Sequence, residues 1–224
     1  MQITEVSVIG IRSAVTELVT AGGSLRFRLF PMIHFGMPEF YLQVVKRLRD
    51  CGLVVAEGLD RPSSTGYAYM LAARITGRRG ARALVSQDID YASLGVPVIW
   101  PDGPEQQARH KRGLGIWGWL DVVLLTPVLA VSMFLGGQDW LLRSRMEFDD
   151  TTEARLRFGT KILIDKRDAK ILVTLEEIYQ QHRDEDVTVA IVFGAAHMPA
   201  VVRGLYSRYD YRARSGEWLS IIDF

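Results

Sequence analysis

The sequence predicts an α/β fold with a mixed, mainly parallel sheet, helices on both faces and a helical insertion around residues 104–150. Short apolar runs alternate with helical patterns along the chain, which is typical of a parallel sheet covered by helices. The runs at 53–57 and 188–194 are continuously apolar, as expected of strands buried on both faces. No repeat of about 20–50 residues is present, so we expect neither a solenoid nor a propeller. No linker marks a domain boundary, so we expect a single domain over 1–224.

The individual elements follow from turn and capping signals. The first two predicted strands, 3–11 and 25–33, are separated by the turn sequence AGGS and are expected to be antiparallel. A helix is expected to begin at Pro38 and to end at Gly52. The other predicted strands are 53–57, 83–87, 96–100, 188–194 and 218–224, and the other predicted helices are 66–80, 104–112, 151–183 (one helix, or two with a joint at Gly159) and HMPAVVRGLYSRY.

Composition excludes several classes of protein. The chain has 224 residues, of which 48% are hydrophobic and 24% charged, as in a packed globular protein and unlike a disordered or collagenous one. A net charge of +1 gives no basic surface for nucleic acid. A single cysteine, Cys51, excludes an intramolecular disulfide and any multi-cysteine metal site. Together with the lack of a secretory signal pattern, this predicts a cytoplasmic protein, with membrane association through the segment described next.

Residues 114–137 form one unusually apolar stretch, LGIWGWLDVVLLTPVLAVSMFLGG. Its 24 residues are enough to cross a bilayer, but the charge of Asp121 and the presence of Pro127 count against a simple span. Basic residues flank it on both sides: Arg109, Lys111 and Arg112 before it, and Arg143 and Arg145 after it. Three interpretations stay open: a buried or dimer-interface helix pair, a monotopic or re-entrant membrane contact, and a span. The insertion at about 114–142 is therefore the candidate for membrane contact or for a homodimer.

Polar side chains come at the ends of five predicted strands. They are His34, Glu57, Gln87, Asp102 and His197. Because ligands bind at the carboxyl ends of the strands in such sheets, we expect these residues to line one rim. The other two histidines, His110 and His182, lie in polar segments and are expected to be solvated.

Two kinds of chemistry suit this set of residues. Imidazole and carboxylate groups can bind a divalent metal such as Zn, Mn or Co, which acidifies a bound water. The ligands would be His34, His197, Glu57 and Asp102. Alternatively, a histidine paired with a carboxylate deprotonates water without a metal. A third interpretation is that both histidines are structural polar residues under loops. Motifs of other enzyme classes are absent or out of context. GLGIWG matches the glycine pattern of dinucleotide-binding proteins but does not follow a predicted strand. Neither a P-loop nor a G-x-S-x-G motif is present.

Four segments resemble the TraB/PrgY/GumN family, which is related to the Tiki proteases and more distantly to erythromycin esterase and the haem-binding ChaN lipoprotein. FPMIHFGMPEFYLQVVKRLRDCGLVVAEGL resembles that family's opening motif, a strand ending in G-x-x-H followed by a helix and a strand ending in Glu. GAAHMPAVVRGL, at 194–205, resembles its second G-x-x-H. ALVSQDIDYASLGVPVIWPD resembles its middle segment, and KILIDKRDAKI resembles the region with an Arg-Asn pair. The similarity runs in the same order from about residue 25 to 210.

The resemblance implies a site made of His34, Glu57 and His197, supported by Asp102 and Arg167. In that role Arg167 would clamp a substrate carboxylate or stabilise an oxyanion. The chain departs from the family pattern twice. Pro31 stands where a glycine is expected and has no N–H to donate, and Asp168 replaces the asparagine beside Arg167. Characterised relatives include metal-dependent proteases, a metal-independent esterase and proteins without demonstrated catalysis.

These observations lead to three hypotheses about the function of the protein. The first is a metal-dependent hydrolase of amide or ester bonds, similar to a peptidase, in which Glu57, His197, His34 and Arg167 are catalytic. Its substrate would be a peptide or a small molecule. The alternative is a non-catalytic protein that binds a peptide or small ligand at a diverged site and associates with a membrane or a partner. The third is a membrane-associated scaffold whose rim is incidental.

Overall fold

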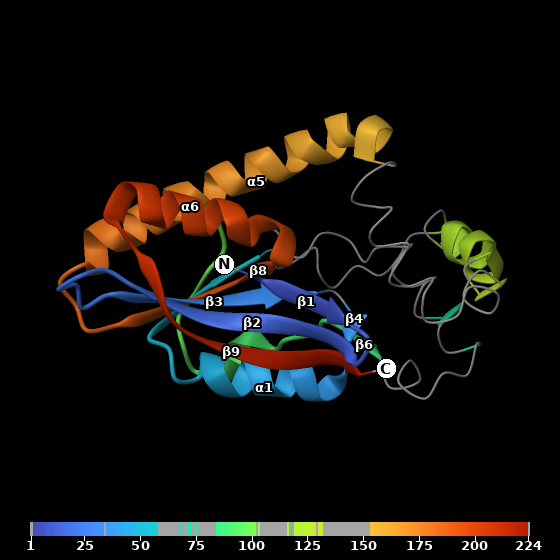
Figure 1. The fold of residues 1–224 in the computed structure, drawn as a ribbon, viewed down its shortest axis with the longest axis horizontal. Helices are drawn as coiled ribbons and strands as arrows, with labels where there is room; N and C mark the ends of the chain where they lie inside the picture. The colour runs from blue at the N-terminus through green and yellow to red at the C-terminus, as the bar shows by residue number, and fades with distance from the viewer. Residues whose placement is uncertain are drawn as a thin grey trace.

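A seven-stranded mixed sheet, with helices on its two faces, confirms the predicted α/β class (Figure 1). The structure is a computed structural model. It describes residues 2–33, 35–57, 68, 71–72, 75, 84–101, 103, 116, 119–128, 130–131 and 153–223, and of 153–166 the backbone alone. Two predicted site residues, His34 and Asp102, lie outside the described residues, and so do the predicted helix 104–112, the basic residues that flank the apolar stretch and most of the insertion 104–150.

The main sheet has a parallel centre and an antiparallel side. Its parallel strands lie in the order β3 (Arg26–Met32), β8 (Thr188–Gly194), β5 (Leu53–Ala56) and β7 (Val98–Ile99). On the other side of β3, strand β2 (Gly10–Val19) runs antiparallel to it. The pairing is made by residues 16–18, which lie after the predicted strand 3–11, so the expected pairing of 3–11 with 25–33 is wrong in its segment although the direction is antiparallel. Strands β1 (Thr4–Ser7) and β9 (Arg212–Asp223) both pair antiparallel with β2.

The two central strands are buried on both faces, as their apolar sequences predict. All four residues of β5 are buried, and in β8 only the last residue, Gly194, is partly exposed. Parallel pairing sets Ala56 of β5 opposite Val192 of β8, so both strands end at the same edge. The residues that follow them therefore meet at one rim of the sheet.

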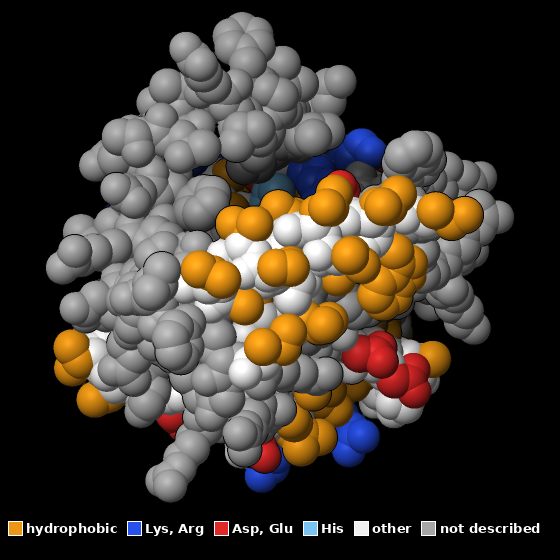
Figure 2. All heavy atoms as spheres, turned by 90° about the vertical axis from the view of Figure 1, so that its right-hand side faces the viewer, with side chains coloured by type: hydrophobic (Ala, Val, Ile, Leu, Met, Phe, Trp, Pro, Cys, Tyr) orange, Lys and Arg blue, Asp and Glu red, His pale blue; other side chains and the backbone are white. Residues whose placement is uncertain are grey.

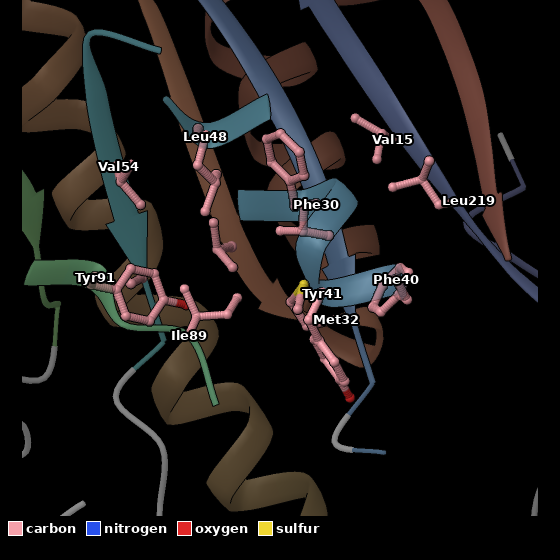
Figure 3. Close-up of a cluster of buried hydrophobic side chains, with 14 of the residues drawn as sticks. Val15, Phe30, Met32, Phe40, Tyr41, Leu48, Val54, Ile89, Tyr91 and Leu219 are labelled. Atoms are coloured by element: carbon pink, nitrogen blue, oxygen red, sulfur yellow. The ribbon is translucent and has the colours of Figure 1, made fainter. Parts of the chain in front are cut away.

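Helices close the two faces over separate hydrophobic clusters. Helix α1 (Pro38–Leu48), with a proline in its first turn, packs on one face together with the short helix η2 (Tyr91–Leu94). Figure 3 shows part of this cluster, in which Phe30 and Met32 of β3 lie near Phe40 of α1. Helices α5 (Glu153–His182) and α6 (Met198–Tyr209), the second preceded by the turn η3 (Ala195–His197), cover the opposite face. Helix α5 is continuous through Gly159, so the alternative of two helices is wrong.

The structure differs from the predicted strands at four places. The strand predicted at 218–224 begins earlier, as β9 (Arg212–Asp223), and of the strand predicted at 96–100 only β7 (Val98–Ile99) is formed. The predicted strand 3–11 is divided into β1 and β2 at Gly10, whose φ of +147° favours glycine and where a Cβ would lie 2.2 Å from the carbonyl oxygen of Ile222. The predicted strand 83–87 contributes only β6 (Val85–Ser86), which pairs with β4 (Phe35–Gly36) in a separate two-stranded sheet. Of the described residues 84–87, Val85 and Ser86 are in strand conformation, and their partners Gly36 and Phe35 keep them in this separate sheet.

Part of the apolar insertion is described and is helical at 119–128. In Figure 1 this helix stands beyond the edge at which the parallel strands end, away from the sheet. Among the described residues, no helix combines the length and the apolar character needed to cross a membrane.

Candidate functional site

Glu57 and His197 come together at the carboxyl edge of the parallel strands, as the sequence predicts. Glu57 directly follows β5, and its backbone N–H donates to the carbonyl oxygen of Val192 in β8 at 2.9 Å. His197 ends the η3 turn that follows β8 and leads into α6. Helix α5 crosses the same edge and supplies two more charged side chains, Arg167 and Asp168.

The Glu57 carboxylate is held by two donors. Its Oε2 accepts the backbone N–H of Gly194 at 2.6 Å, and its Oε1 accepts from the Arg167 guanidinium at 3.0 Å. Only 9% of the Glu57 side chain is exposed. A Cβ at Gly194 would lie 3.3 Å from Glu57 Oε2, a close contact that would press on the carboxylate. The last residue of β8 therefore takes part in the site through its backbone.

The His197 imidazole lies between two carboxylates. Its Nδ1 is 2.7 Å from Asp168 Oδ1, and its Nε2 is 3.5 Å from Glu57 Oε1. Because an ionised carboxylate can only accept a hydrogen bond, Nδ1 carries a hydrogen and donates it to Asp168. The imidazole is 7% exposed, and the ring of Phe193 stands nearly perpendicular to it at 6.1 Å. The ring is thus held in one orientation, with Nε2 facing Glu57.

The charges of this cluster shift both central pKa values. Burial alone would raise the pKa of Glu57, but His197, the amide of Gly194 and Arg167 together lower it. The Glu57 carboxylate raises the pKa of His197, burial opposes this, and Asp168 raises it further, so the net direction is upward. The pair therefore favours a carboxylate facing an imidazolium, and the neutral imidazole that forms at higher pH is more basic than an ordinary histidine.

This arrangement suits the activation of water. A histidine whose Nδ1 is held by a carboxylate presents Nε2 to accept or return a proton. Arg167 brings a positive charge to the same place, where it neutralises Glu57 and can stabilise an oxyanion. The predicted catalytic residues Glu57, Arg167 and His197 are all brought together here.

The described donors suit a metal only in part. Nε2 of His197 and the facing oxygen of Glu57 could share a cation, whereas Asp168 contacts the other ring nitrogen and would act as an outer carboxylate that orients the ligand. Within the described ranges, no group of three or more His, Cys, Asp or Glu residues could hold a metal. A catalytic zinc usually has three protein ligands, so a metal here would need a further one. The predicted ligands His34 and Asp102 lie outside the described part of the chain.

Two residues that the sequence did not mark as part of the site lie at it in the structure, Asp168 and Tyr91. Asp168 stands in the sequence analysis as a departure from a family pattern, yet it is the partner of His197. Tyr91, in η2, is buried, and its hydroxyl is close enough to Glu57 for that charge to raise its pKa in addition to the larger effect of burial. The predicted rim residue Gln87 is also buried and lies near Tyr91. No sequence signal marks Tyr91, because its position depends on how η2 packs.

No family model matches the chain, and no curated protein or solved structure matches it either. The resemblance to the TraB/PrgY/GumN family therefore stays a prediction. The function proposed below depends on the geometry of the described residues.

Proposed function

We propose that the protein hydrolyses amide or ester bonds, with His197 and Glu57 acting on the attacking water. The observation that supports this most directly is the 2.7 Å hydrogen bond from His197 Nδ1 to Asp168, with Nε2 facing Glu57. A carboxylate on Nδ1 keeps the imidazole in the tautomer and orientation that let Nε2 take up a proton. The expected substrates are peptides or small esters.

In the proposed reaction, Nε2 of neutral His197 accepts a proton from water while the water oxygen bonds to the carbonyl carbon of the substrate. The same proton then passes to the leaving nitrogen or oxygen as the C–N or C–O bond breaks. Asp168 stabilises the imidazolium that exists between these steps, and Arg167 stabilises the charge on the carbonyl oxygen. Glu57 orients the water through the oxygen that faces Nε2.

A divalent metal such as Zn, Mn or Co is compatible with the same site if further ligands join His197 and Glu57. His34 and Asp102 are the candidates that the sequence offers. The ion would supply an acidified water and a polarised carbonyl.

The test is hydrolysis of 4-nitrophenyl acetate and of fluorescently labelled casein by the purified full-length chain. We expect His197→Gln and Glu57→Gln to lower the rate at least a hundredfold. The control is His182→Gln, because His182 pairs with Glu185 at the surface. An equal rate in His197→Gln and the unmodified protein would refute the proposal.

The metal is tested separately, by mass spectrometry of protein purified without a chelator. About one equivalent of metal, absent from a His34→Ala, His197→Ala double variant, would support the metal-dependent form. Full activity after exhaustive treatment with EDTA would support the metal-free form.

A non-catalytic binding protein is the second candidate. Its supporting observation is that both oxygens of Glu57 and both ring nitrogens of His197 already face protein groups, as in a network that only holds a binding site in place. Under this hypothesis, neither substrate is hydrolysed, and a peptide library yields a ligand whose binding is weakened by Arg167→Ala.

A further inference from the structure

An unusually apolar surface belongs to the described helical residues of the insertion, 116, 119–128 and 130–131. Its exposed side chains include Trp119, Val123, Leu124 and Val128, which are 50%, 64%, 67% and 61% exposed. Figure 2 looks onto the right-hand end of Figure 1 and shows hydrophobic side chains gathered over this face of the molecule. An exposed apolar patch on a folded protein marks a site that binds another protein, a membrane or a ligand.

The helix touches the remainder of the protein along a narrow stripe. Within 119–128, only Val122 and Thr126 are buried, and they are one helical turn apart. The Thr126 hydroxyl donates to the carbonyl oxygen of Val122 at 2.6 Å, so this polar group is satisfied within the helix itself. Taking 3.6 residues per turn, the exposed positions cover about two thirds of the helix circumference.

The exposed apolar side chains extend around most of the helix, and this indicates that lipid, and not a protein partner, surrounds it. A helix that packs against a protein partner has an apolar stripe of about 100° and a polar remainder. Here nearly all the exposed positions are apolar, and the charge within 114–137, Asp121, lies in the first turn of the described helix. A helix that is apolar over most of its circumference is found either in a protein core or in hydrocarbon. Because these side chains are exposed on the protein, hydrocarbon is the surrounding that suits them.

The sequence around the helix complements an anionic membrane. Tryptophans, which prefer the interface between lipid and water, lie toward both ends of the apolar stretch, at Trp117, Trp119 and Trp140. Arginine and lysine residues flank it on both sides at 109–112 and 143–145. Basic residues next to an inserted apolar segment are attracted to anionic headgroups.

We propose that the helix described at 119–128 inserts into the surface of an anionic lipid bilayer. Because the helix stands beyond the edge where the parallel strands end, this docking would turn the Glu57–His197 edge toward the membrane (Figure 1). The proposal does not depend on hydrolysis and holds equally for an enzyme and for a binding protein.

The experiment is flotation of the full-length chain with two kinds of vesicle. One is pure phosphatidylcholine, and the other is phosphatidylcholine with phosphatidylglycerol at a ratio of three to one. The test variant carries Leu124→Glu and Val128→Glu. The matched control carries Leu42→Glu on α1 and Val173→Glu on α5, which are 66% and 57% exposed.

We expect the unmodified protein and the control to float with the anionic vesicles, and the test variant to lose at least nine tenths of this binding. All three proteins should have the same thermal midpoint, because every substituted side chain is exposed. Failure of the unmodified protein to float would overturn the proposal, as would equal flotation of the test variant. Equal flotation with both vesicle types would overturn the assignment to anionic lipid. A lipid-free dimer that the test variant converts to a monomer would identify the occupant as a second copy of the chain.

Discussion

The Tyr91 hydroxyl offers a sharp test of the energetics of this core. Tyr91 is 9% exposed, and its hydroxyl is buried with no hydrogen-bond partner among the residues that the structure describes. Gln87 is close enough to lower its pKa, but no hydrogen bond of normal geometry joins the two. Burial raises the pKa of Tyr91, so the hydroxyl keeps its proton, and among the described residues no acceptor for that proton is present.

Tyr91→Phe removes this hydroxyl and little else. The ring would keep its edge-on contact with Trp100, whose centroid is 5.1 Å away, and its place in the cluster of Figure 3. A buried polar group without a partner costs about 1–3 kcal/mol, so the free energy of unfolding should rise by an amount in this range. In a protein of this size, each kcal/mol raises the thermal midpoint by about 2–4 °C.

The assay is urea unfolding followed by tryptophan fluorescence, with Tyr211→Phe as the matched control. Tyr211 is 2% exposed, and its hydroxyl donates to the carbonyl oxygen of Leu25 at 3.1 Å. Its loss should lower the free energy of unfolding by about 1 kcal/mol, because a buried carbonyl loses its donor. A loss of stability in Tyr91→Phe as large as in Tyr211→Phe would mean that the Tyr91 hydroxyl has an acceptor and that the reasoning is wrong.

Four further predictions concern the site and the single thiol. Asp168→Asn should lower kcat/KM at least a hundredfold with little change in KM, because Nδ1 loses the carboxylate that orients it. Gly194→Ala should lower activity, because its Cβ would crowd Glu57 Oε2, and a normal kcat/KM would contradict the tight contact. The pKa of Glu57 is lower in the folded protein than the usual 4.5, so Glu57 stabilises the fold above pH 4.5, and this stability is lost as the pH falls through the lowered pKa. The pKa of His197 is higher in the folded protein than the usual 6.5, so His197 stabilises the fold below pH 6.5, and this stability is lost as the pH rises through the raised pKa. Urea unfolding from pH 3 to pH 9 should therefore show both losses, and Glu57→Gln should remove the acid one. Burial raises the pKa of Cys51 from 9.0 to about 11, so its reaction with Ellman's reagent at pH 8 should be about a hundred times slower in the native than in the unfolded protein, and equal rates would contradict its burial.

The parts of the fold that could be predicted are those that local sequence determines. LVVA and TVAIVF are continuously apolar, so they were recognisable as doubly buried strands, and the residues after them, Glu57 and His197, could be assigned to one rim. The division of the first strand was harder to predict, because the turn between β1 and β2 is made by Val8 and Ile9, with Ser7 paired to Gly10. Both turn residues are apolar and β-branched, and so resemble strand residues in the sequence.

Glu57, Arg167 and His197 were predictable members of the site, whereas Asp168 and the contacts within the site were not. Strand ends indicate where Glu57 lies, but nothing local indicates that Asp168 contacts Nδ1 and Glu57 faces Nε2 of the same imidazole. That geometry depends on how α5 crosses the edge of the sheet, which is a matter of packing between distant segments. The burial of the Tyr91 hydroxyl, without a hydrogen-bond partner in the described part of the chain, cannot be read from sequence for the same reason.

The position of β8 between β3 and β5 has a consequence for how the protein reaches its native state. The hydrogen bond from Gly194 to Glu57 joins residues 137 positions apart, and the one from Arg26 to Thr188 spans 162 positions. Bringing such distant segments together costs loop entropy before any strand contact compensates for it, so this step should be slow. Since β8 carries both the amide that holds Glu57 and the turn that presents His197, no folding intermediate without this strand can contain the site. Regain of hydrolysis during refolding should accordingly follow the last, cooperative phase, with no partial activity before it.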